Sequence, residues 1–152
     1  METQIKHYVV GFLFDHRLVA DSPYVCLIKK THPAWQKGKL NGVGGHIEEG
    51  ESADDAMRRE FREEAGLDIS KWKHFATLEL SGEFICNFFC SDMPNDADAP
   101  EPISVTDEKI TWEEVYDLPE NVISNLRWLI PLALDSSVDR PVKIFMKQRL
   151  SR

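Results

Sequence analysis

Three glutamates at helical spacing are the residues of this chain best suited to chemistry. Glu60, Glu63 and Glu64 stand at i, i+3 and i+4, so their side chains would share one face of a helix. Like charges placed this way repel one another by roughly 0.2–0.5 kcal/mol per pair. A hard cation that prefers oxygen ligands would turn this repulsion into binding. The three carboxylates therefore predict a magnesium site.

The flanking residues predict the helix that would carry this site. Ser52 is suited to cap the N-terminus, and Gly66 can take the left-handed conformation that ends a helix. Ala53, Met57 and Phe61 recur every four residues and form an apolar stripe. Because the stripe lies next to the face of the glutamates, we expect the carboxylates at the border of the core.

A glycine-rich segment precedes this helix. Gly42-Val43-Gly44-Gly45 lacks a Cβ at three of four positions, so its main-chain groups can approach a phosphate or a cation closely. In a chain of net charge −8, an acidic helix is usually a solvated surface. The glycines and the carboxylate spacing together favour a binding site over that alternative.

The same segment resembles the sequence box of the Nudix hydrolases, G-x5-E-x7-R-E-U-x-E-E-x-G-U, in which U is a bulky apolar residue. The nine defined positions are filled without a gap by Gly45, Glu51, Arg59, Glu60, Phe61, Glu63, Glu64, Gly66 and Leu67. A match at nine positions is far more specific than a lone glycine motif. The resemblance implies an α/β Nudix fold, in which a mixed β-sheet lies between α-helices.

The resemblance also implies roles for individual residues. It assigns the binding of Mg²⁺, or of Mn²⁺ in its place, to Glu60, Glu63, Glu64 and the carbonyl of Gly44. It makes Glu51 and Arg59 the pair that ties the loop to the helix. Bound magnesium neutralises a phosphoanhydride, holds its phosphates in line and lowers the pKa of a water. The expected reaction is hydrolysis of a phosphoanhydride without a covalent enzyme intermediate.

A second, partial resemblance concerns the residues before the box. They are similar to the MutT-type nucleoside triphosphate diphosphatases and their oxidised-purine members, where W-N-G-x-G-G is common, although Leu40 replaces the tryptophan. Asn41 can pair with a base edge and Trp35 can stack on the base. The alternatives are a turn-forming Asn41 and a half-buried anchor at Trp35. The base-reading residues of the oxidised-purine enzymes are not evident around Ser124 to Arg127.

Basic and glycine residues complete the candidate substrate site. Lys30 and Lys39 flank the loop that leads to the glycines, and either can pair with a phosphate, although a solvated lysine is the usual state. The substrate-binding residues expected from these arguments are Trp35, Lys39, Asn41, Gly44 and Gly45.

One further catalytic candidate lies outside the box. Nudix family members often add a carboxylate from a later loop as a metal ligand or general base, and Asp107-Glu108 precedes an expected strand. We expect Glu108, which has the longer side chain, to swing onto the metal-bound water when substrate arrives. A solvated acid is the alternative.

We interpret the chain as a magnesium-dependent hydrolase of a nucleoside triphosphate, such as 8-oxo-dGTP, that yields nucleoside monophosphate and pyrophosphate. One alternative is a pyrophosphatase for ADP-ribose, a dinucleotide polyphosphate or a nucleotide sugar, because such enzymes share the box. The other is a nucleotide-binding sensor of the same fold that does not turn over its ligand.

Composition limits the class of protein. A chain of 152 residues with 42% hydrophobic content is expected to form one domain over residues 1–152. A pI near 5.1 argues against binding a nucleic-acid polymer, and no apolar run is long enough for a membrane span. We expect a cytoplasmic location, and a homodimer is a candidate assembly. Cys26, Cys86 and Cys90 lie in apolar runs, which favours buried free thiols over disulfides.

Hydrophobic periodicity predicts the remaining elements. Strands are expected at 7–15, 24–30, 72–80, 83–91, 109–116 and 142–146, with a hairpin turn at Ser81-Gly82. Loops are expected at 32–39 and at 92–101, the second of them mobile. A second helix is expected at 123–134, kinked or ended by Pro131. The aromatic residues expected in the core are Phe84, Phe88, Phe89, Trp112 and Trp128.

Overall fold

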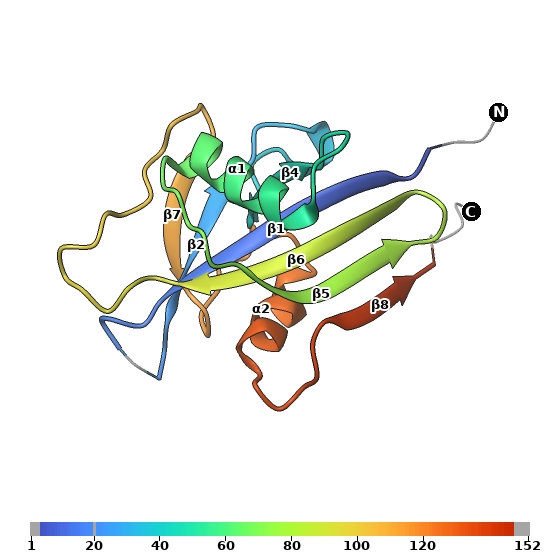
Figure 1. The fold of residues 1–152 in the computed structure, drawn as a ribbon. Coiled ribbons are helices and arrows are strands. Elements are labelled where there is room, and N and C mark those ends of the chain that lie inside the picture. The colour runs from blue at the N-terminus through green and yellow to red at the C-terminus, as the bar shows by residue number, and fades with distance from the viewer. Residues whose placement is uncertain (1–3, 20, 148–152) are drawn as a thin grey trace.

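A computed structural model describes residues 4–19 and 21–147 of the chain (Figure 1). Within these ranges the strands are β1 (Lys6–Asp15), β2 (Tyr24–Lys29), β3 (Leu40–Asn41), β4 (Val43–His46), β5 (Lys73–Leu80), β6 (Phe84–Asp92), β7 (Lys109–Glu114) and β8 (Val142–Met146). The helices are α1 (Ala53–Ala65), α2 (Leu126–Leu134) and the short 3-10 helix η1 (Ala34–Gln36). The expected hairpin is formed by β5 and β6, and its turn contains Gly82 at a φ of 72°.

Strand β1 is central to a mixed sheet with the order β3-β2-β1-β6-β5-β8. One edge of β1 pairs with β6 in parallel along nearly its whole length. Its other edge is divided between two antiparallel partners: β4 pairs with the first half, as at Val10 and Gly44, and β2 pairs with the second, as at Leu13 and Cys26. This division places the glycine-rich strand β4 beside β1 and directly before α1.

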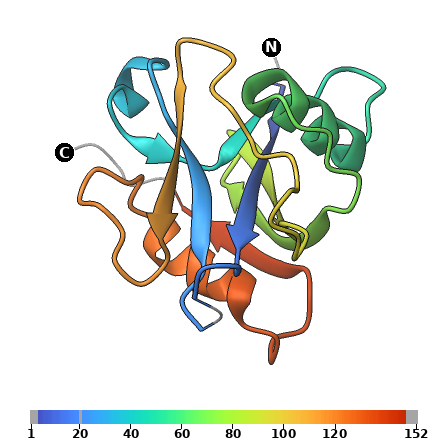
Figure 2. The same ribbon diagram turned by 90° about the vertical axis from the view of Figure 1, so that its left-hand side faces the viewer.

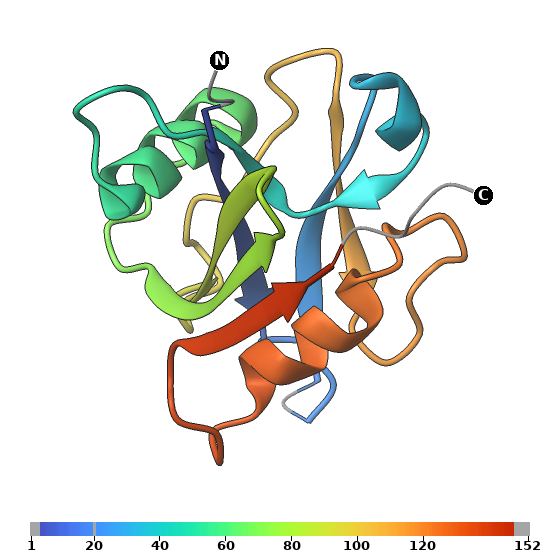
Figure 3. The same ribbon diagram turned by 90° about the vertical axis from the view of Figure 1, so that its right-hand side faces the viewer.

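Helices α1 and α2 cover opposite faces of the sheet (Figures 1 and 3). Because side chains alternate along a strand, β1 contributes to two cores. Val9 and Leu13 pack in the cluster that contains Phe61 of α1, whereas Phe12 packs in the cluster that contains Leu129 of α2. The expected mixed sheet between helices is thus confirmed.

Helix α1 begins and ends at the residues predicted from the sequence. The Ser52 hydroxyl accepts a hydrogen bond of 3.1 Å from the Asp55 N–H, which satisfies one of the free donors of the first turn. Gly66 ends the helix at a φ of 68°. A Cβ on Gly66 would also lie 3.0 Å from Ile103, so the segment between β6 and β7 packs closely against this end of α1.

Helix α2 ends at Leu134, as predicted, but starts later than expected. It begins at Leu126 rather than at residue 123, because the preceding residues form turns in which the Leu126 and Arg127 N–H groups bond to the Ile123 and Ser124 carbonyls, three residues earlier. Pro131 lies inside the helix and does not end it, since α2 continues to Leu134.

The segment after β6, for which a mobile loop is expected at 92–101, contacts the rest of the protein at several points, and its mobility stays a prediction. Met93 is buried, and its N–H donates to the Phe14 carbonyl at 2.8 Å. Arg17 donates from Nη1 to the Asp96 carbonyl at 2.8 Å and from Nη2 to Glu101 at 2.7 Å. These contacts tie the segment to the end of β1 and to the residues that follow it.

Two further expectations about the core can be compared with the structure. The three cysteines are buried and free, as predicted. Trp128 is 42% exposed and does not belong to the core, because it lies on the outer side of α2, whereas Leu129 and Ile130 face the sheet. Among the residues that the structure describes, no helix is long and apolar enough to span a bilayer.

Candidate active site

The box glutamates lie along α1 where the helix meets β4. The Glu60 side chain is only 13% exposed and that of Glu63 is 56% exposed. A Cβ on Gly45 would lie 2.5 Å from Glu60 Oε1, and a Cβ on Gly44 would collide with the Val9 carbonyl of β1. A side chain at position 44 would therefore collide with β1, and one at position 45 would collide with the carboxylate of Glu60.

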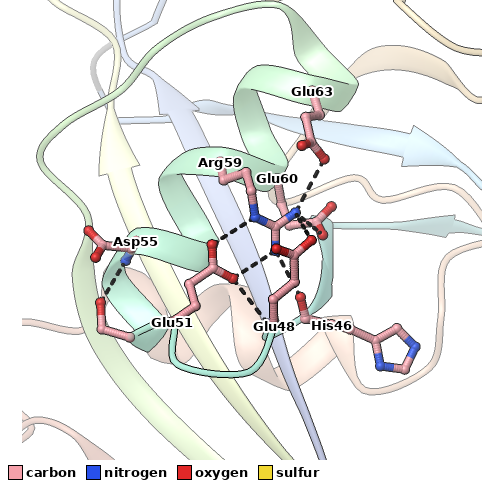
Figure 4. Close-up of polar contacts among 8 residues, drawn as sticks. His46, Glu48, Glu51, Asp55, Arg59, Glu60 and Glu63 are labelled. Atoms are coloured by element: carbon pink, nitrogen blue, oxygen red, sulfur yellow. Dashed lines mark hydrogen bonds and ion pairs between the residues drawn. The ribbon is translucent and has the colours of Figure 1, made fainter.

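Arg59 ties the loop before α1 to the helix (Figure 4). Its Nε donates to Glu51 Oε2 at 2.7 Å and its Nη2 to Glu51 Oε1 at 2.8 Å, while Nη2 also reaches the His46 carbonyl at 3.0 Å. Nη1 donates to Glu60 at 2.9 Å and to Glu63 at 3.2 Å. Hydrogen bonding to Arg59 holds the pKa of Glu51 below its ordinary value. One guanidinium thus aligns three carboxylates.

Glu64 is the most perturbed of the three box glutamates. Burial raises its pKa to about 7, and the charges of Glu60 and Glu108 act in the same direction, while Lys30 and the Gly44 amide oppose them. Its Oε2 is buried and has no hydrogen-bond partner among the described residues. Burial also raises the pKa of Glu60. Two partly buried carboxylates, one of which has an unpartnered, buried oxygen, need positive charge nearby.

This donor set fits a divalent cation, although the described part of the chain contains no ready-made cluster of three acidic, histidine or cysteine ligands. Arg59 instead draws Glu60 and Glu63 toward its guanidinium. All the available donors are oxygen atoms, which Mg²⁺ and Mn²⁺ prefer. The residues that would hold the metal are Glu60, Glu63 and Glu64, with the Gly44 carbonyl as a predicted further ligand.

Glu108 is placed differently from either expectation for it. It is 2% exposed, so it is neither a solvated acid nor a carboxylate free to swing. It accepts hydrogen bonds from Lys30 Nζ at 3.0 Å and from the Thr31 N–H at 2.7 Å. Burial acts to raise the pKa of Glu108, but these bonds and the charges of Lys30 and His32 outweigh it and hold the pKa below its usual value. Its role as general base stays a prediction.

The Lys30–Glu108 pair was missed in the sequence because the two residues are 78 positions apart. The ladder between β2 and β7 brings them together: Lys29 lies opposite Lys109, and the residues beyond that pair continue side by side. The separate candidates Lys30 and Glu108 thus form one buried ion pair that acts on Glu64.

The chain matches the model of the NUDIX domain over residues 9–134. It belongs to the Nudix hydrolase family. Three solved structures show the same fold at low sequence identity. A NUDIX hydrolase from Nitrosomonas europaea has a TM-score of 0.70 and 16% identity, with 97% of this chain and 82% of that chain covered. A MutT structure, described for the Aliivibrio salmonicida and Vibrio cholerae proteins, has a TM-score of 0.62 and 21% identity, with 86% of this chain and 97% of that chain covered. The NUDIX domain of Shewanella oneidensis NrtR, complexed with ADP ribose, has a TM-score of 0.66 and 21% identity, with 88% of each chain covered.

Three candidate substrate residues of this Nudix protein, Trp35, Lys39 and Asn41, lie between β2 and β4, and the other two, Gly44 and Gly45, lie within β4. Trp35, on η1, is 64% exposed, so it is not a half-buried anchor. Asn41 lies in β3, where its amide donates to Gln36 at 3.1 Å and its oxygen accepts from the Gly42 N–H at 2.8 Å. Lys39 is exposed. The Gln36–Asn41 bond joins η1 to β3.

Proposed function

We propose that this Nudix hydrolase cleaves a phosphoanhydride bond of a nucleoside triphosphate and releases nucleoside monophosphate and pyrophosphate. The observation that supports this most is the buried, unpartnered oxygen of Glu64 beside Glu60 and the glycine strand. A binding module that had lost catalysis would be expected to lack at least one box carboxylate, and all of them are present. A single Nudix domain over residues 1–152 would be sufficient for the reaction.

In this proposal each group of residues has one task. Glu60, Glu63 and Glu64 would hold Mg²⁺, which when bound would neutralise phosphate charge and lower the pKa of a water. Glu51 and Arg59 are positioning residues that keep the loop and the helix in register. A water oxygen forms a bond to phosphorus, the bridging P–O bond breaks, and a carboxylate accepts the proton. Glu108 is the proposed acceptor.

The loop residues are proposed to bind the nucleoside. Trp35 presents an exposed aromatic face on which a base can stack, with a contribution of about 1–3 kcal/mol. Asn41, already bonded through one amide hydrogen and its oxygen, retains one N–H for a base edge. Lys39 and the main chain of Gly44 and Gly45 are proposed to contact phosphates.

A second candidate function is hydrolysis of ADP-ribose or a related dinucleotide or nucleotide sugar. It is favoured by the likeness to the NrtR domain that was crystallised with ADP ribose. The two candidates share the metal site and differ in the group beyond the second phosphate. A nucleotide-binding sensor without turnover remains the third alternative.

A panel of nucleotides distinguishes these functions. Turnover would be measured with Mg²⁺ on canonical and oxidised nucleoside triphosphates, ADP-ribose, a dinucleotide polyphosphate and a nucleotide sugar, with chromatography of the products. We expect the highest kcat/KM for a triphosphate, with pyrophosphate as a product. EDTA should abolish activity and Mg²⁺ should restore it.

The variant that tests the metal assignment is Glu63→Gln, which keeps the shape of an exposed side chain and removes one charge. Its kcat should fall at least about 100-fold at saturating Mg²⁺. Wild-type turnover by this variant would overturn the metal assignment. Nucleotide binding without turnover by the wild-type protein would identify a sensor.

A further inference from the structure

Strand β8 forms one margin of the sheet, beyond β5 (Figures 1 and 3). It pairs with β5 in parallel from Val142 to Met146, and within residues 4–19 and 21–147 no other strand pairs with it. The outer edge of β8 therefore presents main-chain N–H and C=O groups without a strand partner in that part of the chain. An edge of this kind is a template for pairing with another chain.

The side chains of β8 distinguish it from the other margin of the sheet. Phe145 is 61% exposed and Met146 is 40% exposed. The opposite margin is β7, which lies beside β2 (Figure 2), and its apolar side chains Ile110 and Trp112 are only partly exposed. Because exposed apolar surface marks interaction sites, β8 is the margin suited to a partner.

The outward main-chain groups of β8 belong to Lys143 and Phe145. The Met146 carbonyl accepts a hydrogen bond of 3.0 Å from the Ser81 N–H, which directly follows β5. Since successive residues of a strand turn their main-chain groups to opposite sides, Ile144 also faces β5. Lys143 and Phe145 thus each present one N–H and one C=O at the outer edge.

We infer that β8 pairs in antiparallel fashion with β8 of a second copy of this chain. In this pairing Lys143 lies opposite the partner's Phe145, and Ile144 lies opposite the partner's Ile144 at a two-fold axis. The arrangement is isologous, so each copy contributes the same residues. Each Lys143–Phe145 pair exchanges both of its outward main-chain hydrogen bonds.

Other registers of the two strands are disfavoured. A shift by two residues places Lys143 opposite either its own copy or Lys147, and like charges directly opposite destabilise a pair. A shift by one residue brings outward main-chain groups opposite inward ones and moves the apolar side chains to the wrong face. Pro141 has no N–H and ends the ladder. The sequence of β8 therefore favours a single register.

The charges on the face away from α2 are complementary in this register. Within one copy Thr77 lies beside Lys143 and Glu79 beside Phe145, and these four side chains line a hollow of about 360 Å³ together with Ile144. Neighbouring strands are about 4.8 Å apart, so the partner's Lys143 can lie over the Phe145 ring and reach Glu79. A cation is attracted both by the ring and by the carboxylate.

This placement also changes the usual effect of an edge lysine. A lysine on an edge strand normally keeps two edges apart. Here each Lys143 meets an aromatic ring of the other copy rather than a second lysine. The same residue that opposes a misaligned pair therefore stabilises the aligned one.

Sedimentation velocity over a range of concentrations tests the pairing in the wild-type protein. We expect the weight-average sedimentation coefficient to rise from the monomer value toward the dimer value between about 5 and 500 µM, because a short edge contact gives a weak dimer. A protein that stays monomeric over this range would overturn the inference. Growth beyond a dimer would also overturn it, since a two-fold edge contact closes after two copies.

Phe145→Lys is the variant that breaks the contact. It places lysine opposite lysine on both sides of the axis, so the dissociation constant of the dimer should rise at least about tenfold. Within its own chain the new side chain lies beside Glu79, so the melting temperature of the monomer should not fall. Dimerisation at the wild-type concentration would overturn the inference.

A rescue variant and a matched control accompany this measurement. Adding Lys143→Glu to Phe145→Lys places a glutamate opposite each new lysine and should restore the dimer. Tyr116→Lys replaces another exposed aromatic side chain, 69% exposed and outside β8, and should dimerise as the wild type does. A double variant as weak as Phe145→Lys, or equal losses in Tyr116→Lys, would overturn the inference.

Cysteine cross-linking measures the register independently. Side chains at a non-hydrogen-bonded antiparallel pair are close enough for a disulfide, and Ile144 faces its own copy at the axis. Oxidation should link Ile144→Cys into a covalent dimer and link Lys143→Cys much less, because Lys143 lies opposite Phe145. The native cysteines are buried and do not compete in the folded protein. Equal cross-linking of the two variants would overturn the inference.

Discussion

Glu64 combines burial, an unpartnered oxygen and proximity to two other acids, Glu60 and Glu108. Ionising such a group in the folded protein costs free energy, and a bound cation would offset that cost. Ionised Glu64 therefore lowers the stability of the metal-free protein, and the same carboxylate is expected to be a strong metal ligand. Stability and metal binding are therefore linked at this residue.

The stability of the metal-free protein should fall as pH rises from about 4.5 to 7. Burial raises the pKa of Glu64 to about 7, above the ordinary value of about 4.5 that it has in the unfolded chain, so the folded state binds more protons than the unfolded state between these values. The resulting loss is on the order of 1–3 kcal/mol. Thermal unfolding in EDTA across this range measures it.

Glu64→Gln is the variant that checks this linkage. It should flatten that part of the pH profile, raise the melting temperature at pH 8 in EDTA, and abolish most of the stabilisation that Mg²⁺ gives the wild type. A variant with the wild-type slope and the wild-type response to Mg²⁺ would show that other groups dominate the linkage.

At the scale of elements, Arg59 joins α1 to the loop that follows β4. Its side chain and that of Glu51 are largely buried, and their two parallel hydrogen bonds form a geometry that only arginine provides. The neighbouring Arg58 makes an equally short pair with Asp68, but both of those side chains are nearly half exposed. The two arginines therefore form a natural comparison.

Arg59→Ala should lower the free energy of unfolding by about 3–5 kcal/mol, because it leaves buried carboxylates without a partner. Arg58→Ala should cost less than about 1 kcal/mol, because its ion pair is solvated. Urea unfolding of both variants tests this difference. If Arg59→Ala loses activity while its unfolding curve matches the wild type, Arg59 belongs with the reacting groups instead.

Glu108 adds side-chain bonds between the residues that follow β2 and those that precede β7. Glu108→Gln should destabilise the protein by about 1–3 kcal/mol at pH 7, because it removes the charge that compensates Lys30 and weakens the bond to Thr31. Since the folded pKa of Glu108 is lowered, its contribution is present above the unfolded pKa and is lost as pH falls through the folded value.

The same variant tests the proposed role of Glu108 as general base. If the role is correct, kcat falls and the acidic limb of the pH–rate profile flattens at temperatures where the variant is folded. A stability loss with a wild-type profile would make Glu108 a residue that only positions Lys30.

At the scale of the whole molecule, the two helical layers share one sheet, so they are expected to unfold together. Cys26 lies in the α1 cluster, while Cys86 and Cys90 lie in the α2 cluster. Burial raises the pKa of all three thiols, that of Cys26 to about 12. Burial of the thiols and their raised pKa both suppress reaction with a disulfide reagent in the native state.

Ellman's reagent should therefore modify none of the three thiols in native protein within minutes and all three in denaturant. Under native conditions the three should react with one slow rate, set by global opening. Rapid labelling of Cys86 and Cys90 with protection of Cys26 would show that the α2 layer opens by itself.

The segment from Ser52 to Gly66 was predictable because the features that define it are local. The capping serine, the apolar stripe and the terminal glycine each act within a few residues, and the glutamates take their positions from the helical repeat. Their order along the chain was also sufficient to indicate the family. The strands were predictable in outline for the same reason, since alternation is a property of neighbouring residues.

Only the tertiary structure determined the features that depend on distant residues. Glu108 is buried because β7 aligns with β2, and the segment after β6 is held because Arg17 reaches across to it. Lys29 lies opposite Lys109 for the same reason that Glu108 meets Lys30. Burial, pairing and electrostatic environment depend on which strands become neighbours, and that choice results from packing the whole core rather than from any local pattern.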